Sequence, residues 1–291
     1  MTNNNRPNKT HISVIMSVFN GEKYIEESIK SILNQTFKSF EFLIIDDNSS
    51  DETWRIIKKY QQYDSRIKIF KNKTNLGLTE NLNKLIDLSN GEYIARIDAD
   101  DVSFQTRLDK QIKRMKLFNA DISYTDTQII DRNSIPICNS FIPKKESMVV
   151  KSLNCYNFIT HSSVMIRKNF FDTNGKYDTK YKTGQDHELW LRAKKKNAKF
   201  VFIDEVLTKY RLNPDSIRFT QNDYNYRVIK ALLANKCKFE LLRYLRYINF
   251  YQKLATFFRF MVPSFIYLKM ICLKNRLSFI KRNIYGWGED R

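Results

Sequence analysis

The chain has 291 residues, which is enough for one large domain or for one domain with a smaller appendage. Hydrophobic residues make up 42% of it and only 7 glycines and 5 prolines occur, so its composition excludes a fibrous or wholly disordered protein. The formal net charge of +19 favours a polyanionic partner, meaning anionic lipid or nucleic acid; a generally Lys-rich surface is the alternative for the chain as a whole.

The polar start of the chain and the spacing of its cysteines bear on the compartment of the protein. Residues 1–10 include no apolar stretch, which predicts a disordered tail and not a signal peptide. The four cysteines lie far apart and without metal-ligand spacing, at positions 138, 155, 237 and 272. This usage is typical of reduced thiols in a cytosolic protein.

The first hundred residues alternate between two hydrophobic periods. Short apolar runs rich in β-branched residues predict buried strands at residues 11–18, 40–45, 67–70 and 93–97. Apolar residues at helical spacing predict intervening helices at residues 22–33, 51–60 and 78–88. This alternation indicates right-handed βαβ units, so we expect an α/β fold with a mostly parallel, Rossmann-like sheet flanked by helices.

The pattern after residue 101 is less regular. We expect helices at residues 105–118 and 185–195, strands near 121–124 and 163–166, a hairpin and loop over 133–145, and one or two strands over 200–210. From residue 224 onward, stretches of Leu, Ile, Phe and Tyr are interspersed with Lys and Arg, which predicts two or three helices. The sequence therefore predicts an α/β domain over 11–215 and a basic helical C-terminal region over 216–291.

Basic residues are concentrated in this last region. The final 69 residues contain 14 Lys or Arg and 4 Asp or Glu, whereas the first 222 contain 36 and 27. The segment 254–273 is apolar but is interrupted by Arg259, Pro263 and Lys269, so no apolar run approaches the ~20 residues that span a bilayer. Amphipathic helices of this composition are typical of an anionic membrane surface, and a helical cap packed on the first domain is the alternative.

The loops after the four predicted strands are the expected ligand-binding region, because ligands bind beyond the carboxyl ends of parallel strands. These loops are residues 17–20, 46–49, 71–77 and 98–101. Two of them are acidic clusters, which a buried sheet edge avoids unless positive charge compensates them.

Asp98-Ala99-Asp100-Asp101 places three carboxylates within four residues at a strand end. These carboxylates repel one another, and a hard divalent cation such as Mg²⁺ or Mn²⁺ would relieve the repulsion. A solvated acidic turn or helix cap is the alternative for this segment.

The second acidic cluster contains Asp46 and Asp47 and continues to Asp51. A carboxylate here could accept the imide N–H of a uracil ring. The alternative is N-capping of the next helix by Ser50 or Asp51, and both roles can hold because they fall on different residues.

A third segment, residues 183–188, opens a helix whose first apolar residues are Leu189 and Trp190. Asp186 falls in the first turn, where the helix dipole and free N–H groups favour an anion. It is a candidate general base for deprotonating an acceptor hydroxyl, and an ordinary acid at a helix start is the alternative.

Several short motifs, weak singly, occur in a specific order over roughly residues 12–210. They are VIMSVFN at 14–20, ILNQT at 32–36, DDNSSD at 46–51, NLG at 75–77, GEYIARIDADD at 91–101, RL at 107–108, HSSVM at 161–165 and QDHELW at 185–190. In order and spacing they resemble the family 2 glycosyltransferases of the GT-A fold, of the bacterial surface-polysaccharide type.

The resemblance implies a role for particular side chains. Ser17 and Asp47 would hold the nucleotide, with Asp47 at the base. Asp98 and Asp100 would form the DxD motif, with Asp100 as the metal ligand, and Asp186 would be the catalytic base. The resemblance also places His161 near the site, with a structural role as the alternative. Gln185 departs from many relatives, which carry an acid there.

The implied reaction is transfer of a single sugar, with inversion, from a nucleotide-sugar to a hydroxyl. The donor would be a UDP-sugar, the cofactor Mn²⁺ or Mg²⁺, and the acceptor a glycan or an undecaprenyl-diphosphate-linked glycan. The setting implied by the family is O-antigen, capsule or lipooligosaccharide assembly by a cytoplasmic enzyme peripheral to the inner face of the membrane.

Two other classes of protein are alternatives to a glycosyltransferase that transfers a single sugar. A processive polysaccharide synthase of the same fold would carry a Gln-x-x-Arg-Trp motif and several spanning helices, and the sequence contains neither. A nucleic-acid-binding protein would suit the charge, but no helix-turn-helix, finger or RNA-recognition signature occurs, so we expect no nucleic-acid partner.

Overall fold

The computed structural model describes residues 12–212, except 141, 155–156 and 182–183. The chain divides into two compact units, and every described residue belongs to the first, Met1–Leu212. The tail expected at residues 1–10 and the helical region expected at 216–291 lie outside the described residues.

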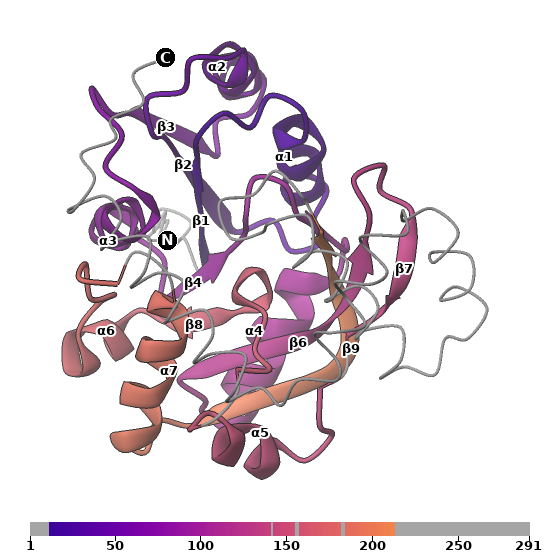
Figure 1. The fold of residues 1–291 in the computed structure, drawn as a ribbon, viewed down its shortest axis with the longest axis vertical. Coiled ribbons are helices and arrows are strands. Elements are labelled where there is room, and N and C mark those ends of the chain that lie inside the picture. Colours follow the sequence, from indigo (N-terminus) through magenta and orange to yellow (C-terminus); the bar gives the residue numbers. More distant parts are fainter. Residues whose placement is uncertain (1–11, 141, 155–156, 182–183, 213–291) are drawn as a thin grey trace, which may run out of the picture. The chain divides into compact units, whose positions relative to one another are not determined.

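Four parallel strands form the first half of the sheet (Figure 1), in the order β3-β2-β1-β4. Their bounds are β1 (Ile12–Val18), β2 (Phe40–Asp46), β3 (Ile67–Lys71) and β4 (Tyr93–Arg96). The helices that connect them are α1 (Ile25–Leu33), α2 (Thr53–Tyr63) and α3 (Leu78–Leu88). The apolar runs and helical stripes of the sequence therefore predicted this half element by element.

The second half extends the sheet with strands of mixed direction. It contains β5 (Val102–Ser103), β6 (Ile122–Ile130), β7 (Pro136–Asn139), β8 (Met165–Arg167) and β9 (Phe200–Arg211). Strand β8 runs antiparallel between β4 and β6, β9 runs parallel to β6, and the short β5 and β7 pair antiparallel with β9 and β6. The sheet therefore has its parallel core at β3-β2-β1-β4 and a mixed extension.

Helices cover the extension of the sheet as well. They are α4 (Arg107–Phe118), α5 (Glu146–Ser152), the 3-10 turn η1 (His161–Ser163), α6 (Asn169–Asn174) and α7 (Gln185–Lys195). The sequence predicted α4 and α7, but α5, α6, β5 and η1 were not expected. Each of these four spans no more than seven residues, too few to establish a clear hydrophobic period.

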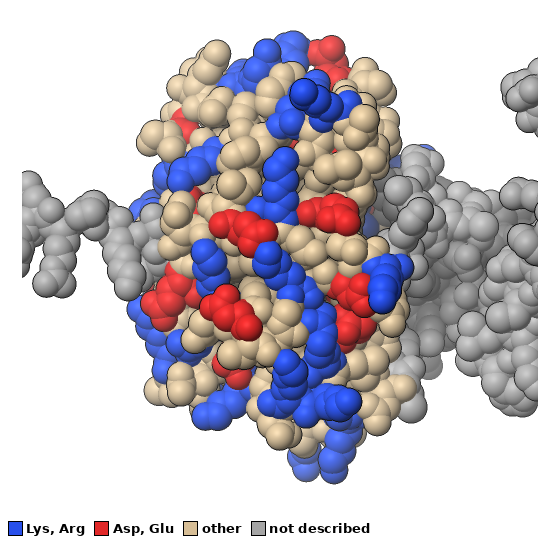
Figure 2. All heavy atoms as spheres, turned by 90° about the vertical axis from the view of Figure 1, so that its left-hand side faces the viewer, with Lys and Arg blue, Asp and Glu red and all other residues tan. Residues whose placement is uncertain are grey.

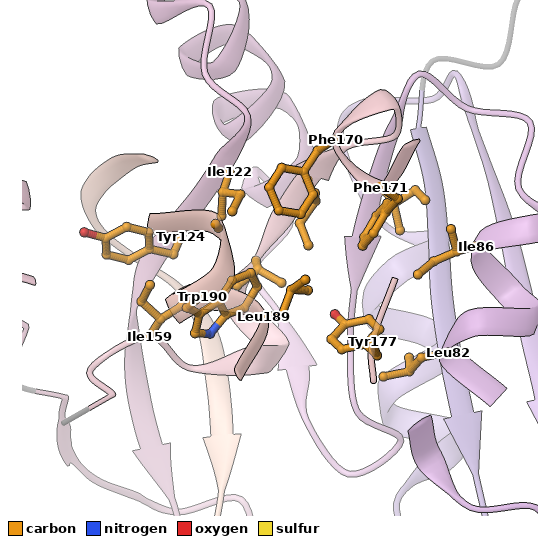
Figure 3. Close-up of a cluster of buried hydrophobic side chains, with 14 of the residues drawn as sticks. Leu82, Ile86, Ile122, Tyr124, Ile159, Phe170, Phe171, Tyr177, Leu189 and Trp190 are labelled. Atoms are coloured by element: carbon orange, nitrogen blue, oxygen red, sulfur yellow. The ribbon is translucent and has the colours of Figure 1, made fainter. Parts of the chain in front are cut away.

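Two hydrophobic clusters fill the two faces of the sheet. One packs Ile25 of α1 and Leu108 of α4 against the strands. The other, drawn in Figure 3, packs Leu82 of α3, Phe170 of α6 and Trp190 of α7 against the opposite face. Burial of each such side chain contributes about 1.5–3 kcal/mol, so both layers hold the sheet rigid beneath its carboxyl edge.

The carboxyl ends of β1, β2, β3 and β4 meet at one edge because these strands are parallel. The loop 97–101 leaves β4 at this edge and enters β5, which pairs with Thr208 and Lys209 near the end of β9. The acidic loop is thus held between the parallel core and β9. Among the described residues, no helix combines the length and the apolarity that a membrane crossing requires.

Candidate active site

The carboxylates of the acidic loop converge beyond the end of β4. One oxygen from each of Asp98, Asp100 and Asp101 lies within 4.8 Å of the other two. The three side chains differ in burial and in what surrounds them, so each has its own electrostatic state.

Asp98 is paired with a buried arginine from the preceding strand. Both terminal nitrogens of Arg96, which is 3% exposed, donate to the carboxylate oxygens of Asp98, and the hydroxyl of Ser162 donates to Oδ2 at 2.8 Å. Burial alone would lower the pKa of Arg96, but the nearby charge of Asp98 outweighs it and raises that pKa. Asp98 is therefore already engaged by hydrogen bonds on both oxygens.

Asp100 makes no ion pair with any described residue. Burial and, secondly, repulsion from Asp98 raise its pKa to about 6, against weaker opposing effects of Arg96 and Arg211. A divalent cation would favour the ionised form and reverse this shift. Its state fits the metal-ligand role that the resemblance implies.

Asp101 is fully buried at the base of the loop. Its Oδ1 accepts the backbone N–H of Arg211 at 2.8 Å, while Oδ2 finds no hydrogen-bond donor among the described residues. Burial, followed by repulsion from Asp100 and Asp98, raises its pKa well above the ordinary value. The sequence placed Asp101 in the cluster but assigned it no role.

The residues of this loop fit a divalent cation. Of the three carboxylates, only Asp98 forms an ion pair, with Arg96, whereas the guanidinium of Arg211 is paired with Glu27. The available donors are carboxylate oxygens, which suit Mg²⁺ or Mn²⁺. Asp100 and the buried, unpartnered Oδ2 of Asp101 could hold such an ion.

Asp47 holds the loop that follows β3. Its Oδ1 accepts hydrogen bonds from the side chain of Asn72 at 2.8 Å and from the backbone of Leu76 at 2.9 Å, and its Oδ2 accepts one from the backbone of Gly77 at 2.8 Å. Burial would raise the pKa of Asp47, but these donors outweigh it and lower the pKa. The carboxylate is therefore ionised and largely occupied within its own loop.

Ser17 belongs to the same polar network. The amide of Asn81 donates to the Ser17 hydroxyl at 3.0 Å and accepts from Asn72 at 2.6 Å, and Asn72 in turn donates to Asp47. The network joins the ends of β1, β2 and β3 to α3. Sequence reasoning named Ser17 and Asp47 but missed both asparagines, since neither stands in a recognisable motif of charged residues.

Neither Ser50 nor Asp51 is the N-cap residue of α2, which is Glu52, but Asp51 accepts hydrogen bonds at the start of this helix. Its Oδ1 accepts the backbone N–H of Thr53, the first residue of α2, at 3.0 Å, and its Oδ2 accepts that of Glu22 at 3.0 Å. Asp46 is buried and lies 3.7 Å from the ammonium of Lys71. Asp51 therefore contacts the start of α2 and the loop after β1, whereas Asp46 lies beside the end of β3.

Asp186 lies in the first turn of α7. The preceding Gly184 adopts a φ of 76°, in the left-handed region that glycine tolerates, and so lets the chain turn sharply into the helix. Asp186 is 8% exposed, and the amide of Asn157 donates to its Oδ2 at 3.0 Å. One carboxylate oxygen is thereby held and the other keeps its capacity to accept a proton.

Gln185, where many relatives have an acid, is fully buried beside Asp186. Neither its amide oxygen nor its amide nitrogen has a hydrogen-bond partner among the described residues. The departure noted in the sequence therefore leaves a neutral, enclosed side chain next to the candidate base.

The buried hydroxyl of Tyr177 is affected by the charge of Asp186 and by that of Asp98 in the acidic loop. Burial raises the pKa of its hydroxyl, Arg96 opposes this, and the charges of both Asp186 and Asp98 raise the pKa further. The turn η1 lies between the acidic loop and α7, because Ser162 donates to Asp98 and the ring of His161 packs edge-on against Trp190 of α7.

His161 packs into the cluster behind this region. Its Nε2 lies 2.8 Å from the hydroxyl of Tyr177, and its ring stands edge-on to those of Tyr177 and Trp190, two of the side chains labelled in Figure 3. The neighbouring Ser162 donates to Asp98. His161 is thus a packed residue next to Ser162, which is compatible with either role that the sequence left open.

A Rossmann-like parallel core with a mixed extension and flanking helices is the architecture of the GT-A fold of glycosyltransferases. The model of "Glycosyl transferase family 2" matches residues 13–172, more than half of the chain. The chain belongs to glycosyltransferase family 2.

Relatives of similar length support this assignment. An uncharacterized glycosyltransferase of Methanocaldococcus jannaschii is 36% identical over 282 residues, which cover 94% of this chain and 96% of the relative. An Escherichia coli protein named UDP-Glc:alpha-D-GlcNAc-diphosphoundecaprenol beta-1,3-glucosyltransferase WfgD is 31% identical over 208 residues, covering 71% of this chain and 79% of WfgD.

The fold is also similar to that of solved structures. The S. aureus TarS fragment 1–349, crystallised in complex with UDP, aligns with a TM-score of 0.58 at 20% sequence identity. The alignment covers 77% of this chain and 65% of that one, so the chain spans slightly less than two thirds of the TarS fragment. The likeness is one of fold.

Proposed function

We propose that this enzyme transfers a single sugar from a UDP-sugar to a hydroxyl of a lipid-linked or glycan acceptor, with inversion and with the help of a divalent cation. The observation that carries the proposal is the gathering of Asp98, Asp100 and Asp101 within 4.8 Å at the sheet edge, linked through Ser162 and His161 to α7, the helix that carries Asp186. A cation site and a proton acceptor there could flank one sugar diphosphate.

The donor side of the proposal rests on the acidic loop. When bound, Mg²⁺ or Mn²⁺ supplies positive charge against which a nucleoside diphosphate can leave. Asp100 and Asp101 would hold the ion, while Arg96 holds Asp98 in place within the loop. The titles of two TarS structures describe UDP and UDP-GlcNAc complexes, which supports a UDP-sugar donor here.

Binding of the nucleotide would fall to the network of Ser17 and Asp47. Asp47 already accepts three hydrogen bonds, and a carboxylate has about four acceptor positions, so it could accept one more from a base N–H. In this proposal Asp47 has two roles: its hydrogen bonds to Leu76 and Gly77 fix the loop after β3, and it also contacts the uracil base.

The acceptor side rests on Asp186. As general base, it would take the proton of the attacking hydroxyl, a contribution of typically ~10²–10⁴-fold. Asn157 holds Oδ2 of Asp186, which would leave Oδ1 to receive the proton. Direct displacement inverts the anomeric configuration, which agrees with the UDP-Glc donor and beta linkage in the printed name of WfgD.

The acceptor class and cellular setting follow the relatives. WfgD is named for an undecaprenol-diphosphate-linked acceptor, and another Escherichia coli relative, WbnJ, is named for O-antigen biosynthesis. We infer a related role in surface-polysaccharide assembly, at the inner membrane face, with basic residues 216–291 providing attraction to anionic lipid. Single transfer is favoured because the sequence lacks a Gln-x-x-Arg-Trp motif.

A donor screen tests the proposal. The purified chain would be incubated with Mn²⁺, a panel of UDP-sugars and a lipid-linked glycan acceptor, and released UDP would be measured. We expect one or two UDP-sugars to give acceptor-dependent release that EDTA abolishes. Release from no UDP-sugar, with release from a GDP- or CMP-linked donor instead, would contradict the proposed donor class.

A further inference from the structure

Arg211, the last residue of β9, has a side chain that is completely enclosed. An enclosed guanidinium is costly unless nearly all its donors are satisfied. Its Nε donates to the backbone carbonyl of Asp100 at 2.7 Å. Nε of Arg211 therefore contacts the backbone of Asp100, the candidate metal ligand.

The other arms of Arg211 are anchored in two distant segments. Nη1 donates to the carbonyl of Asp131 at 3.1 Å and to the hydroxyl of Ser134 at 2.9 Å, both in the turn between β6 and β7. Nη2 donates to Glu27 of α1 at 2.7 Å, and the ring of Tyr24 lies 4.4 Å from the guanidinium carbon. The side chain is thus fixed independently of the acidic loop that it contacts.

The backbone of the same residue holds the next residue of the loop. The N–H of Arg211 donates to Oδ1 of Asp101 at 2.8 Å, and the N–H of Phe104 donates to the carbonyl of Leu207 at 3.0 Å. Together with the pairing of β5 and β9, these bonds tie the downstream half of the loop to β9. These bonds hold Asp100 and Asp101, the two residues that we propose as cation ligands.

We propose that Arg211 is a positioning residue that sets the geometry of the acidic loop for cation binding, acting through the Asp100 carbonyl and the Asp101 carboxylate. The inference rests on the proposed function in that it takes this loop as the cation site. Arg211 does not face the ion; it keeps the loop backbone in the form that directs the Asp100 carboxylate toward it.

The contacts require arginine in particular. A guanidinium presents its donors in a rigid planar fork, whereas an ammonium is a point charge with three donors on a flexible stem. A lysine would keep the positive charge but could not reach Asp100, Ser134 and Glu27 at once. Arg211→Lys therefore keeps the positive charge and removes the planar set of hydrogen-bond donors, so it tests the second without changing the first.

The test compares the full-length wild-type chain with Arg211→Lys. Hydrogen exchange of the metal-free protein is measured for peptides that cover residues 98–104, and Mn²⁺ binding is measured by calorimetry. We expect faster exchange at 98–104 with unchanged exchange in β1, and a Mn²⁺ affinity reduced by about 10–100-fold, the range seen when groups that orient metal ligands are lost.

Lys199→Ala is the matched control, because Lys199 is an exposed cation that directly precedes β9, at the end of the strand that does not pair with β5. It should leave both measurements near wild type. Wild-type exchange and Mn²⁺ affinity in Arg211→Lys would overturn the proposal and leave Arg211 a purely structural residue.

If Arg211→Lys fails to fold, Glu27→Gln replaces it, since it retains Arg211 but weakens one of its anchors. Smaller changes in the same direction at 98–104 and in Mn²⁺ affinity would support the proposal, and wild-type values would overturn it. Exchange in the metal-free protein does not depend on sugar transfer. A wild-type chain that released no UDP would therefore contradict the proposed function without altering this comparison.

Discussion

Aspartates at the carboxyl edge differ in what neutralises them, and this difference separates their functions. Asp47 has a lowered pKa because backbone and amide donors surround it, and Asp98 is paired with Arg96. Asp100 has a raised pKa because burial and Asp98 act on it without a direct partner. This last arrangement leaves a carboxylate whose charge a bound cation would stabilise.

The raised pKa of Asp100 predicts how cation binding depends on pH. A proton competes with the cation for this carboxylate, so affinity should fall as the pH drops through about 6, the pKa of Asp100 in the metal-free protein. For one titrating ligand the loss between pH 7 and pH 5 is about tenfold. Calorimetry with Mn²⁺ at both pH values would measure it.

Asp100→Ala is the companion variant for that titration. It should bind Mn²⁺ more weakly at pH 7, lose most of the Mn²⁺-dependent part of UDP binding, and show a smaller change between the two pH values. A wild-type affinity that is equal at pH 7 and pH 5 would contradict the assignment of Asp100 as a ligand.

Candidate chemical groups were predictable from the sequence, but the residues that orient them were not. Asp98, Asp100 and Asp186 stand out because clustered acids and helix starts have a local signal. Arg211 contacts the loop from 111 residues away in the sequence. Such a contact depends on which strands become neighbours, and no local pattern carries that information.

The elements of the parallel core were predicted better than those of the extension. Buried parallel strands such as β2 are continuous apolar runs, and α3 and α7 were predicted with their observed bounds. Strand β6 was expected to end near Tyr124 but continues to Ile130. Its later residues are largely polar and pair with β9 across a bulge, so tertiary pairing overrides the local pattern.

Helix α7 carries a stability prediction, because it supports Asp186 through a buried face. Trp190→Ala should destabilise the chain by about 3–5 kcal/mol, since a fully buried indole is replaced by a cavity. Leu191→Ala, on the same helix but 37% exposed, should change the free energy of unfolding by less than about 1 kcal/mol. Urea denaturation of both variants measures the difference, and equal effects would show that α7 is not anchored by this face.

On the scale of the whole molecule, positive charge is distributed unevenly. The face shown in Figure 2 carries basic side chains interspersed with acidic ones, and basic side chains gather toward the lower end of the view. Several of the cations on the described part of the chain are paired, such as Lys176 with Asp87 and Arg192 with Glu188. The last 69 residues have an excess of 10 Lys and Arg over Asp and Glu, against 9 in the first 222 residues, so their positive charge per residue is more than three times as high.

This distribution predicts salt-sensitive binding to anionic membranes. The full-length chain should co-sediment with vesicles that contain phosphatidylglycerol at low salt and much less at 0.5 M salt, because screening shortens the range of the attraction. Neutral phosphatidylcholine vesicles are the control. Equal binding to both kinds of vesicle, or none at low salt, would contradict an electrostatic attachment.

The central claim is that a cation site on the acidic loop and a proton acceptor on α7 serve one sugar diphosphate. Its most direct test is Asp186→Asn, assayed for UDP release with the donor that the screen identifies and, in the same preparation, for UDP binding with Mn²⁺. The account predicts a loss of turnover of at least ~10²-fold with UDP affinity within about twofold of wild type. Turnover near the wild-type rate in Asp186→Asn would contradict it.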